Sequence, residues 1–203
     1  MSDFTISFWM HTSLNQMSGT CSRWDDGTGL VHSGPGSFAS NDYGISICDG
    51  RIVAGAGSTS VTPMNYVNDS RWHMVTFSRQ RSNGDLKVYI DGTFASSQIA
   101  GTALLNTRTT LDLGTSNGTN FYSGNLDELT IWESTLTGEE VNALYQRQSP
   151  KFSGYATSRV MSTPTVQPWT GLQWKTNKPF GKELPDYDGS PMNETNGWYQ
   201  DIV

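Results

Sequence analysis

The sequence predicts an all-β protein, an antiparallel β-sandwich with one short helix and an irregular C-terminal extension. Short segments in which apolar residues alternate with polar ones recur along the chain, bounded by Gly, Asn, Asp and Ser. The 203 residues include 21 Gly, and aromatic residues make up 11%, a mixture typical of a turn-rich β-protein with large core side chains. The length suits one buried core plus an extension.

The first half of the chain contains three clear strand patterns. Residues 4–10 alternate Phe4, Ile6 and Phe8 on one face. Residues 44–48 and 51–54 flank Asp49-Gly50, a dipeptide that favours a two-residue hairpin turn. We therefore expect these last two strands to pair directly.

Further strands are predicted in the middle of the chain. Residues 72–79 carry large apolar side chains at both odd and even positions, which predicts a strand covered on both faces. Residues 86–90 run into a second hairpin turn at Asp91-Gly92. Residues 109–113 and 126–132 complete the predicted set, separated by a polar loop at residues 114–120.

One segment has the pattern of a helix. Thr137 is a suitable N-cap, and Glu140 lies three residues on, as in a capping box. Val141, Leu144 and Tyr145 form an apolar stripe. The composition changes after Gln148, so we predict a sandwich over residues 1–148 and an aromatic-rich extension over residues 149–203, which packs on the sandwich or on a neighbouring chain.

The two cysteines, Cys21 and Cys48, do not have the spacing of a zinc site. If residues 20–24 and 44–48 pair antiparallel, one register sets Cys21 opposite Cys48 and Trp24 opposite Ile45. That register predicts a disulfide. The alternative is two small buried thiols.

Several classes of function are excluded by composition. The formal net charge is -6, and no cluster of Lys and Arg is present, so nucleic acid is not an expected partner. No apolar stretch reaches the roughly 20 residues that span a bilayer, so we expect no membrane insertion.

No signal peptide is apparent, and the abrupt apolar start suggests a fragment of a longer protein. The three histidines occur in no recognisable nucleophile motif, and no catalytic residue is predicted.

Three groups of motifs resemble the laminin-G-like domains of the concanavalin A-like lectin and glucanase superfamily. The resemblance covers roughly the first 146 residues and implies a jelly-roll sandwich. The matching residues are Phe-Thr-Ile-Ser-Phe-Trp-Met at 4–10, Asp-Ser-Arg-Trp-His-Met-Val-Thr-Phe at 69–77 with Gly84 and 86–92, and 111–114 with 124–132, Leu136-Thr137 and Glu140-Val141.

The chain departs from this family pattern at its beginning. Such domains have a further strand before the first motif, and only three residues precede it here. A missing edge strand would leave ladder groups and apolar surface exposed. We therefore expect residues 198–203 or residues 155–161 to fill the vacant edge, within the chain or in a neighbouring copy, which would make a homo-oligomer.

The resemblance implies a non-catalytic recognition module of a secreted or surface protein, extracellular or at the cell surface, that binds a glycan or an extracellular protein in the manner of an adhesin. The alternative is a structural spacer or oligomerising tip. A glycoside hydrolase is a third reading, and it needs two facing carboxylates. Asp127 and Glu128 are adjacent in sequence and point to opposite faces of a strand, and Glu133 completes no such pair.

Ligand binding is expected at a rim formed by the loops, where aromatic rings stack on sugars and amides bond hydroxyl groups. Each of these residues taken alone is an ordinary loop or core residue, and only the cluster points to a site. The candidates are Trp24, Asn41, Asp42, Tyr43, Asn117, Asn120, Phe121 and Tyr122.

The resemblance also implies a calcium ion at the rim, held by Asp or Asn side chains and backbone carbonyls, because oxygen ligands suit this ion. The matching positions are Asp25, Asp26 and Asn120, with Asp127 as a second possibility. The alternative is that Asp25-Asp26-Gly27 simply forms a turn.

Overall fold

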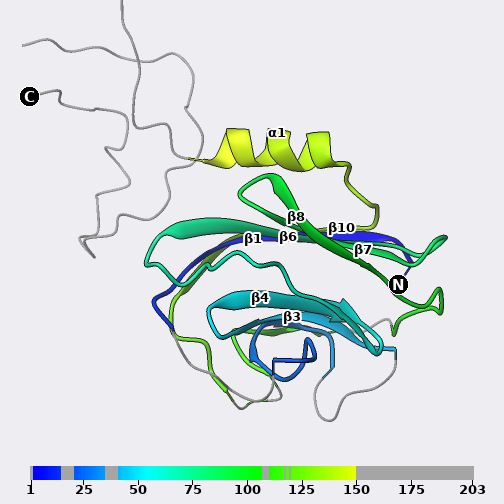
Figure 1. Ribbon diagram of the computed structural model, residues 1–203, viewed down its shortest axis with the longest axis horizontal. Helices are drawn as coiled ribbons and strands as arrows, with labels where there is room; N and C mark the ends of the chain where they lie inside the picture. Colours follow the sequence, from blue (N-terminus) through cyan, green and yellow to red (C-terminus); the bar gives the residue numbers. More distant parts are fainter. Residues whose placement is uncertain are drawn as a thin grey trace, which may run out of the picture. The chain divides into compact units, whose positions relative to one another are not determined.

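The computed structural model describes residues 2–14, 21–34, 41–106, 110–116, 118 and 120–149. Within the compact unit Met1–Gln146, two antiparallel five-stranded sheets pack face to face (Figure 1). This confirms the predicted antiparallel β-sandwich. The predicted C-terminal extension, including residues 155–161 and 198–203, lies outside the described residues.

The first sheet, sheet A, has the strand order β10-β1-β6-β7-β8. Its strands are β1 (Phe4–His11), β6 (Trp72–Gln80), β7 (Asp85–Ile90), β8 (Thr93–Ile99) and β10 (Asn125–Trp132). The first strand of the chain is therefore central, paired with β6 on one side and with β10 on the other.

The second sheet, sheet B, has the order β5-β4-β3-β2-β9. It consists of β2 (Thr28–His32), β3 (Tyr43–Cys48), β4 (Arg51–Ala56), β5 (Thr59–Val61) and β9 (Asp112–Leu113). Residues 21–24 do not form the strand that pairs with β3, which was the pairing considered from the sequence. Residues 28–32 take that place, and residues 21–27 form a loop.

The two predicted hairpins are confirmed. Asp49 and Gly50 have φ angles of 50° and 70°, and Asp91 and Gly92 have 51° and 74°. Positive φ at both central residues is the requirement of the turn that matches strand twist, and Gly adopts it without a steric cost. These turns fix the register of β3 with β4 and of β7 with β8.

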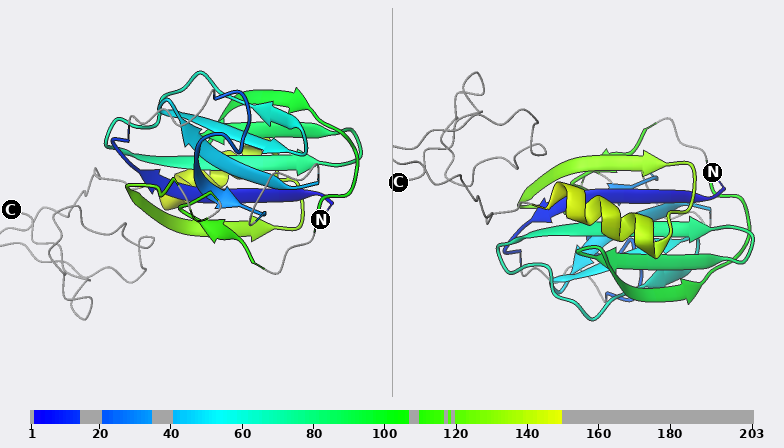
Figure 2. Two further views of the ribbon diagram at one scale, coloured as in Figure 1. Left: turned by 90° about the horizontal axis from the view of Figure 1, so that it is seen from below. Right: turned by 90° about the horizontal axis from the view of Figure 1, so that it is seen from above.

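The main core lies between the sheets. The side chains of β1 alternate, so that Phe4, Ile6, Phe8 and Met10 enter this core and Trp9 faces the other way. On the outer face of sheet A, Trp9 stacks on Tyr145 of α1 (Gly138–Gln148) with ring centroids 5.7 Å apart. The helix therefore covers sheet A, as the right-hand view of Figure 2 shows.

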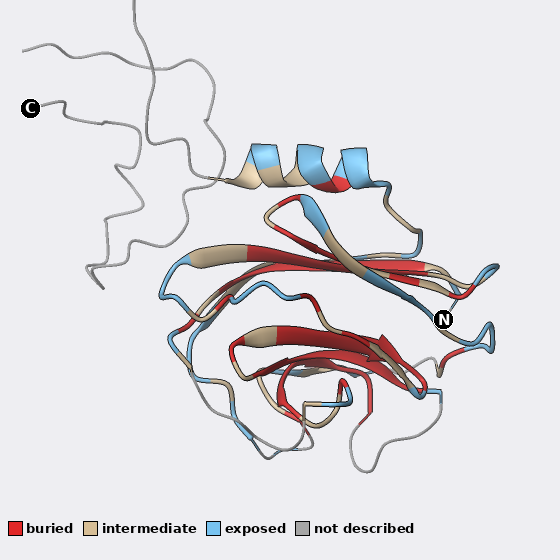
Figure 3. Cartoon of the chain, viewed as in Figure 1, coloured by how far each residue is buried: buried red, intermediate tan, exposed pale blue. Residues whose placement is uncertain are grey.

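The predicted capping box is confirmed at the start of α1. The Glu140 backbone N–H donates to Thr137 Oγ1 at 3.2 Å, and the Thr137 N–H donates to Glu140 Oε2 at 2.8 Å. Both bonds satisfy donors that the helix itself leaves unpaired. Val141, fully buried, then anchors the helix against the outer face of sheet A. Figure 3 shows that the side of the helix turned away from sheet A is exposed.

Candidate functional site

The predicted ligand-binding residues do not gather at one place. Tyr43 packs against Phe4 at the start of β1, with ring centroids 4.9 Å apart. The Tyr122 hydroxyl donates to the carbonyl of His11 at the other end of β1, at 3.0 Å. At about 3.3 Å per residue, the two ends of this strand lie roughly 23 Å apart. Asn117 lies outside the described residues.

Trp24 is a core residue and not an exposed aromatic platform. Its side chain is 1% exposed, and its indole N–H donates to the Gly57 carbonyl at 2.9 Å. The ring lies against the outer face of sheet B, where Gly44 of β3 and Gly55 of β4 are opposite each other in register. Two facing residues without side chains make the room that the indole fills.

Asp42 and Tyr43 are also buried, whereas the neighbouring Asn41 is exposed. Asp42 Oδ1 accepts a hydrogen bond from Asn106 Nδ2 at 2.8 Å, and burial raises the pKa of Tyr43. Both side chains hold the end of the sandwich together. As placed, they do not present their polar groups to a ligand.

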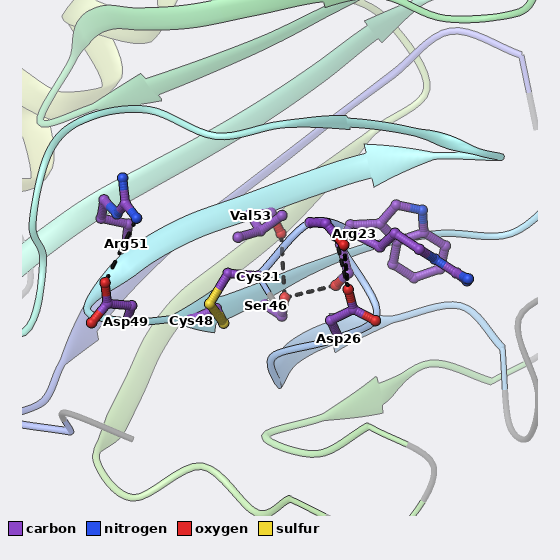
Figure 4. The surroundings of a disulfide bond; sticks show 10 residues. Cys21, Arg23, Asp26, Ser46, Cys48, Asp49, Arg51 and Val53 are labelled. Atoms are coloured by element: carbon purple, nitrogen blue, oxygen red, sulfur yellow. Dashed lines mark hydrogen bonds and ion pairs between the residues drawn. A yellow bond between two sulfur atoms is a disulfide. The ribbon is translucent and has the colours of Figure 1, made fainter. Parts of the chain in front are cut away.

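The loop of residues 21–27 covers the outer face of sheet B (Figure 4). A disulfide joins Cys21 to Cys48 at the end of β3, with Cα atoms 5.6 Å apart. Ser46 Oγ donates to the Trp24 carbonyl at 2.6 Å. The disulfide therefore connects a loop to a strand, and not two paired strands as the sequence suggested.

Three of the four predicted calcium ligands accept hydrogen bonds from protein donors. Arg23 donates to both carboxylate oxygens of Asp25, at 2.9 and 2.6 Å. Asp26 Oδ2 accepts from the Arg23 N–H at 3.0 Å and closes the turn. Asp127 Oδ1 accepts from the Glu128 N–H at 2.8 Å, on β10. Asn120 is exposed in the loop before β10.

The four residues come from two parts of the sandwich: Asp25 and Asp26 from the loop over sheet B, and Asn120 and Asp127 from the loop before β10 and from β10 itself. Burial lowers the pKa of His32, and the nearby Asp25 opposes this shift. Across the described ranges, no three or more His, Cys, Asp or Glu residues are arranged to hold a metal ion. Calcium binding stays a prediction.

One end of the sandwich does gather exposed and half-buried aromatic side chains. We call it the loop end and define it by His11, Tyr66, Trp72, Phe121 and Tyr122. The rings of His11 and Trp72 lie 5.6 Å apart, and Phe121 is 70% exposed beside the half-buried Tyr122. Tyr66 is also exposed, with the Arg51 guanidinium 5.8 Å from its ring centre.

Hydrogen bonds fix the position of this aromatic group. Thr12 Oγ1 donates to the Ser123 carbonyl at 2.6 Å, next to the Tyr122 bond to the His11 carbonyl. Burial raises the pKa of Tyr122 to about 12, so the phenol remains protonated. The loop before β10 is therefore tied to the end of β1. Of the loop-end residues, only Phe121 and Tyr122 were among the predicted ligand contacts.

The carboxylates of β10 do not have the arrangement of a retaining hydrolase. Asp127 is the register partner of Trp9, and the pairing with β1 shifts between Ser7 and Trp9. Glu128 has a φ angle of 51° at this irregularity. Both acids belong to one bulge of one strand, whereas a catalytic pair flanks the scissile bond from two sides.

Comparisons with known structures give the same fold. The botulinum neurotoxin serotype G binding domain is 17% identical with a TM-score of 0.54, over 73% of this chain and 37% of that one. The binding domain of Paraclostridial Mosquitocidal Protein 1 is 24% identical with a TM-score of 0.51, over 71% and 37%. This chain thus spans little more than a third of either toxin domain.

A third structure is closer to this chain in length. Domain 4 of AbnA, a GH43 extracellular arabinanase from Geobacillus stearothermophilus solved in complex with arabinotriose, is 22% identical with a TM-score of 0.53, over 72% of this chain and 68% of that one. Within the described part of this chain, no helix is both long and apolar enough to cross a bilayer.

A family model of laminin G type matches residues 1–142, and the chain therefore belongs to the concanavalin A-like lectin/glucanases superfamily.

Proposed function

We propose that this chain is a non-catalytic recognition module of a secreted or surface protein, and that it binds a glycan at the loop end. The observation that carries the proposal is the exposed Phe121, next to Tyr122, whose hydroxyl is bonded to the His11 carbonyl at the end of the sandwich where the His11 and Trp72 rings also meet. An exposed aromatic ring on a fixed support presents an apolar face to a sugar ring with little loss of conformational entropy.

Polar groups at the same end would supply the hydrogen bonds that orient a sugar. Asn120 and Asn125 are exposed on either side of the Phe121–Tyr122 pair, and both have donor and acceptor atoms. Asp69, exposed, adds a carboxylate close to His73 at the start of β6. A few fixed polar groups around aromatic rings are the usual composition of a small-molecule site.

Two further observations support the proposal. Among structures of this fold is the arabinanase domain solved with arabinotriose, and the toxin structures are themselves binding domains. The Cys21–Cys48 disulfide suits an oxidising compartment, which agrees with a secreted or surface location. The bulge that holds Asp127 and Glu128 offers no facing carboxylates, which favours binding over hydrolysis.

A glycan array that includes arabino-oligosaccharides, followed by calorimetry on any hit, tests this proposal. We expect Phe121→Ala and Trp72→Ala to weaken binding by at least about tenfold, as for an aromatic residue at the centre of a binding site. Phe94→Ala is the matched control, because Phe94 is an exposed aromatic next to Tyr89 on the outer face of sheet A, on β8, and β7 separates it from the strand that holds Trp72.

The same titrations with and without a calcium chelator test the predicted calcium dependence. Equal binding by the wild type and the Phe121 variant would contradict the loop-end site. If no glycan binds and the full chain forms a stable oligomer in solution, the spacer or oligomerising function gains the support that the recognition module loses.

A further inference from the structure

The sandwich is open along one side. On the other side, β5 of sheet B lies against β8 of sheet A. On the open side, the edge strands are β9, which has only two residues, and β10. Between them lies a groove of about 230 Å³ lined by Phe8, Val31, Leu113, Leu126, Asp127, Glu128 and Leu129. We call it the seam.

Apolar side chains that point into the core are exposed at the seam. Ile131 is the register partner of Ile6, so both point to the same side of sheet A, yet Ile131 is 37% exposed and Ile6 is fully buried. Leu113 is the partner of Val31 in sheet B and is 51% exposed, whereas Val31 is buried. Among the described residues, nothing covers the core on this side.

The seam also has a backbone edge. In the described part of the chain β10 pairs only with β1, and Figure 2 shows it as the outermost strand of sheet A. The outer edge of an eight-residue strand presents N–H and C=O groups that can pair with another strand. An apolar groove beside such an edge matches the two requirements of strand addition, which are main-chain hydrogen bonds and pockets for alternate side chains.

We propose that the seam binds a β-strand supplied by another polypeptide. The incoming segment is extended, pairs with the outer edge of β10, and has apolar residues at alternate positions that enter the groove over Phe8 and Val31. It also has Lys or Arg close to Asp127 and Glu128. This proposal does not depend on glycan binding at the loop end, since the two surfaces share no residue.

The size and charge of the seam favour this occupant over a small molecule and over a second copy of the chain. A groove of about 230 Å³ is smaller than the roughly 300–1,000 Å³ of sites for drug-sized molecules, but it accommodates side chains of a strand. β10 has two acids and no Lys or Arg. Two copies that paired through β10 would bring these acids together, and like charges across strands are destabilising. A basic strand has the complementary charge.

Hydrogen exchange of the full chain with a synthetic peptide tests the proposal. The probe has about nine residues, with Val at alternate positions and Lys or Thr between them. We expect it to slow exchange of those β10 amides that do not face β1. Leu113→Lys and Leu129→Lys should each weaken peptide binding by about tenfold or more. Ile99→Lys, on the opposite edge strand β8 and also exposed, is the matched control and should have no effect.

Two control peptides separate strand addition from nonspecific contact. A peptide with Glu in place of Lys should bind more weakly, and a peptide N-methylated at alternate residues, which lacks the required N–H donors, should not protect β10. Equal binding of all three peptides would overturn the proposal. So would β10 amides that are already protected without peptide. If the protection of the β10 amides without peptide rises with protein concentration, a second copy of the chain occupies the seam. If it does not depend on protein concentration, residues of the same chain occupy the seam.

Discussion

Gly44 shows how a single missing side chain determines packing at the residue scale. A Cβ atom at this position would lie 2.7 Å from Cζ3 of Trp24, which is closer than real Cβ contacts. We predict that Gly44→Ala displaces the indole from the outer face of sheet B and destabilises the protein by about 1–3 kcal/mol, as overpacking does. Urea unfolding measures the change.

Gly101→Ala is the control for this variant. A Cβ atom at Gly101 would meet no heavy atom within 4 Å, so the free energy of unfolding should stay within about 0.5 kcal/mol of the wild type. Equal destabilisation by the two substitutions would show that Gly44 does not act through Trp24.

His73 lies between two carboxylates at the loop end. Its Nδ1 is 2.8 Å from Asp91 Oδ2 and its Nε2 is 3.0 Å from Asp69 Oδ1. Both ring nitrogens donate only in the protonated imidazolium, so the arrangement favours the charged form. The hydrogen bond with Asp91 raises the pKa of His73, assisted by Asp69 and opposed by burial.

This arrangement predicts a pH-dependent stability. Because the folded pKa of His73 lies above the unfolded value, its contribution is fully present below about pH 6.5 and is lost as the pH rises through the folded pKa. We expect His73→Gln to cost about 1.5–3 kcal/mol near pH 5.5 and less near pH 8, measured by urea unfolding. Asp69→Asn should reduce the pH dependence. A cost of His73→Gln that is equal at both pH values would contradict the prediction.

At the scale of elements, the disulfide holds the loop of residues 21–27 on sheet B. It closes a loop of 27 residues, and the chain-entropy model gives a stabilisation of about 3–4 kcal/mol for that length. We predict that the Cys21→Ser, Cys48→Ser double variant loses about this much stability in urea. It should also be cleaved by trypsin after Arg23, and mass spectrometry identifies the fragment. Resistance at Arg23 would mean that Trp24 holds the loop without the disulfide.

The capping box makes a prediction for α1. Thr137→Ala removes the hydroxyl that accepts the Glu140 N–H, and we expect a loss of about 0.5–2 kcal/mol. Hydrogen exchange should be faster in the first turn of the helix. Glu139→Gln, which changes a neighbouring charge but no capping bond, should cost at most about 0.5 kcal/mol.

The sequence predicts an element well where one local signal is sufficient. The Asp-Gly turns and the Thr137–Glu140 box each lie within a few residues and have a single structural meaning. β2 was missed because Gly29 interrupts its apolar pattern at a bulge. β8, with only Phe94, Ala95 and Ile99 as apolar residues, has no regular alternation that would mark a half-buried strand.

The positions of the candidate site residues were predicted less well because they depend on contacts between distant residues. Trp24 next to two acids resembles an exposed aromatic loop, and only the pairing of Gly44 with Gly55 shows that the indole is buried. His11 and Trp72 lie at the ends of strands 61 residues apart and meet through the register of β1 with β6. Such placement follows from topology, which local patterns do not contain.

At the scale of the whole molecule, the two sides of the sandwich should differ in local stability. β1, β3, β4 and β6 lie inside their sheets, whereas β9 and β10 border the seam. We predict that native-state hydrogen exchange gives opening free energies close to the global value for β1 and β6, and clearly lower values for β9 and the outer amides of β10. Uniform protection across sheet A would contradict this.

The central position of β1 has a consequence for biosynthesis. This strand leaves the ribosome before the other strands of the sandwich, but its partner β10 ends at Trp132, about 120 residues later. At roughly 5–20 residues per second, one edge of β1 waits about 6–25 s for that partner, with Phe4, Ile6, Phe8 and Trp9 in its sequence. A nascent chain of this kind is exposed to aggregation, and a chaperone that shields β1 (Phe4–His11) would act at the step where shielding is most effective.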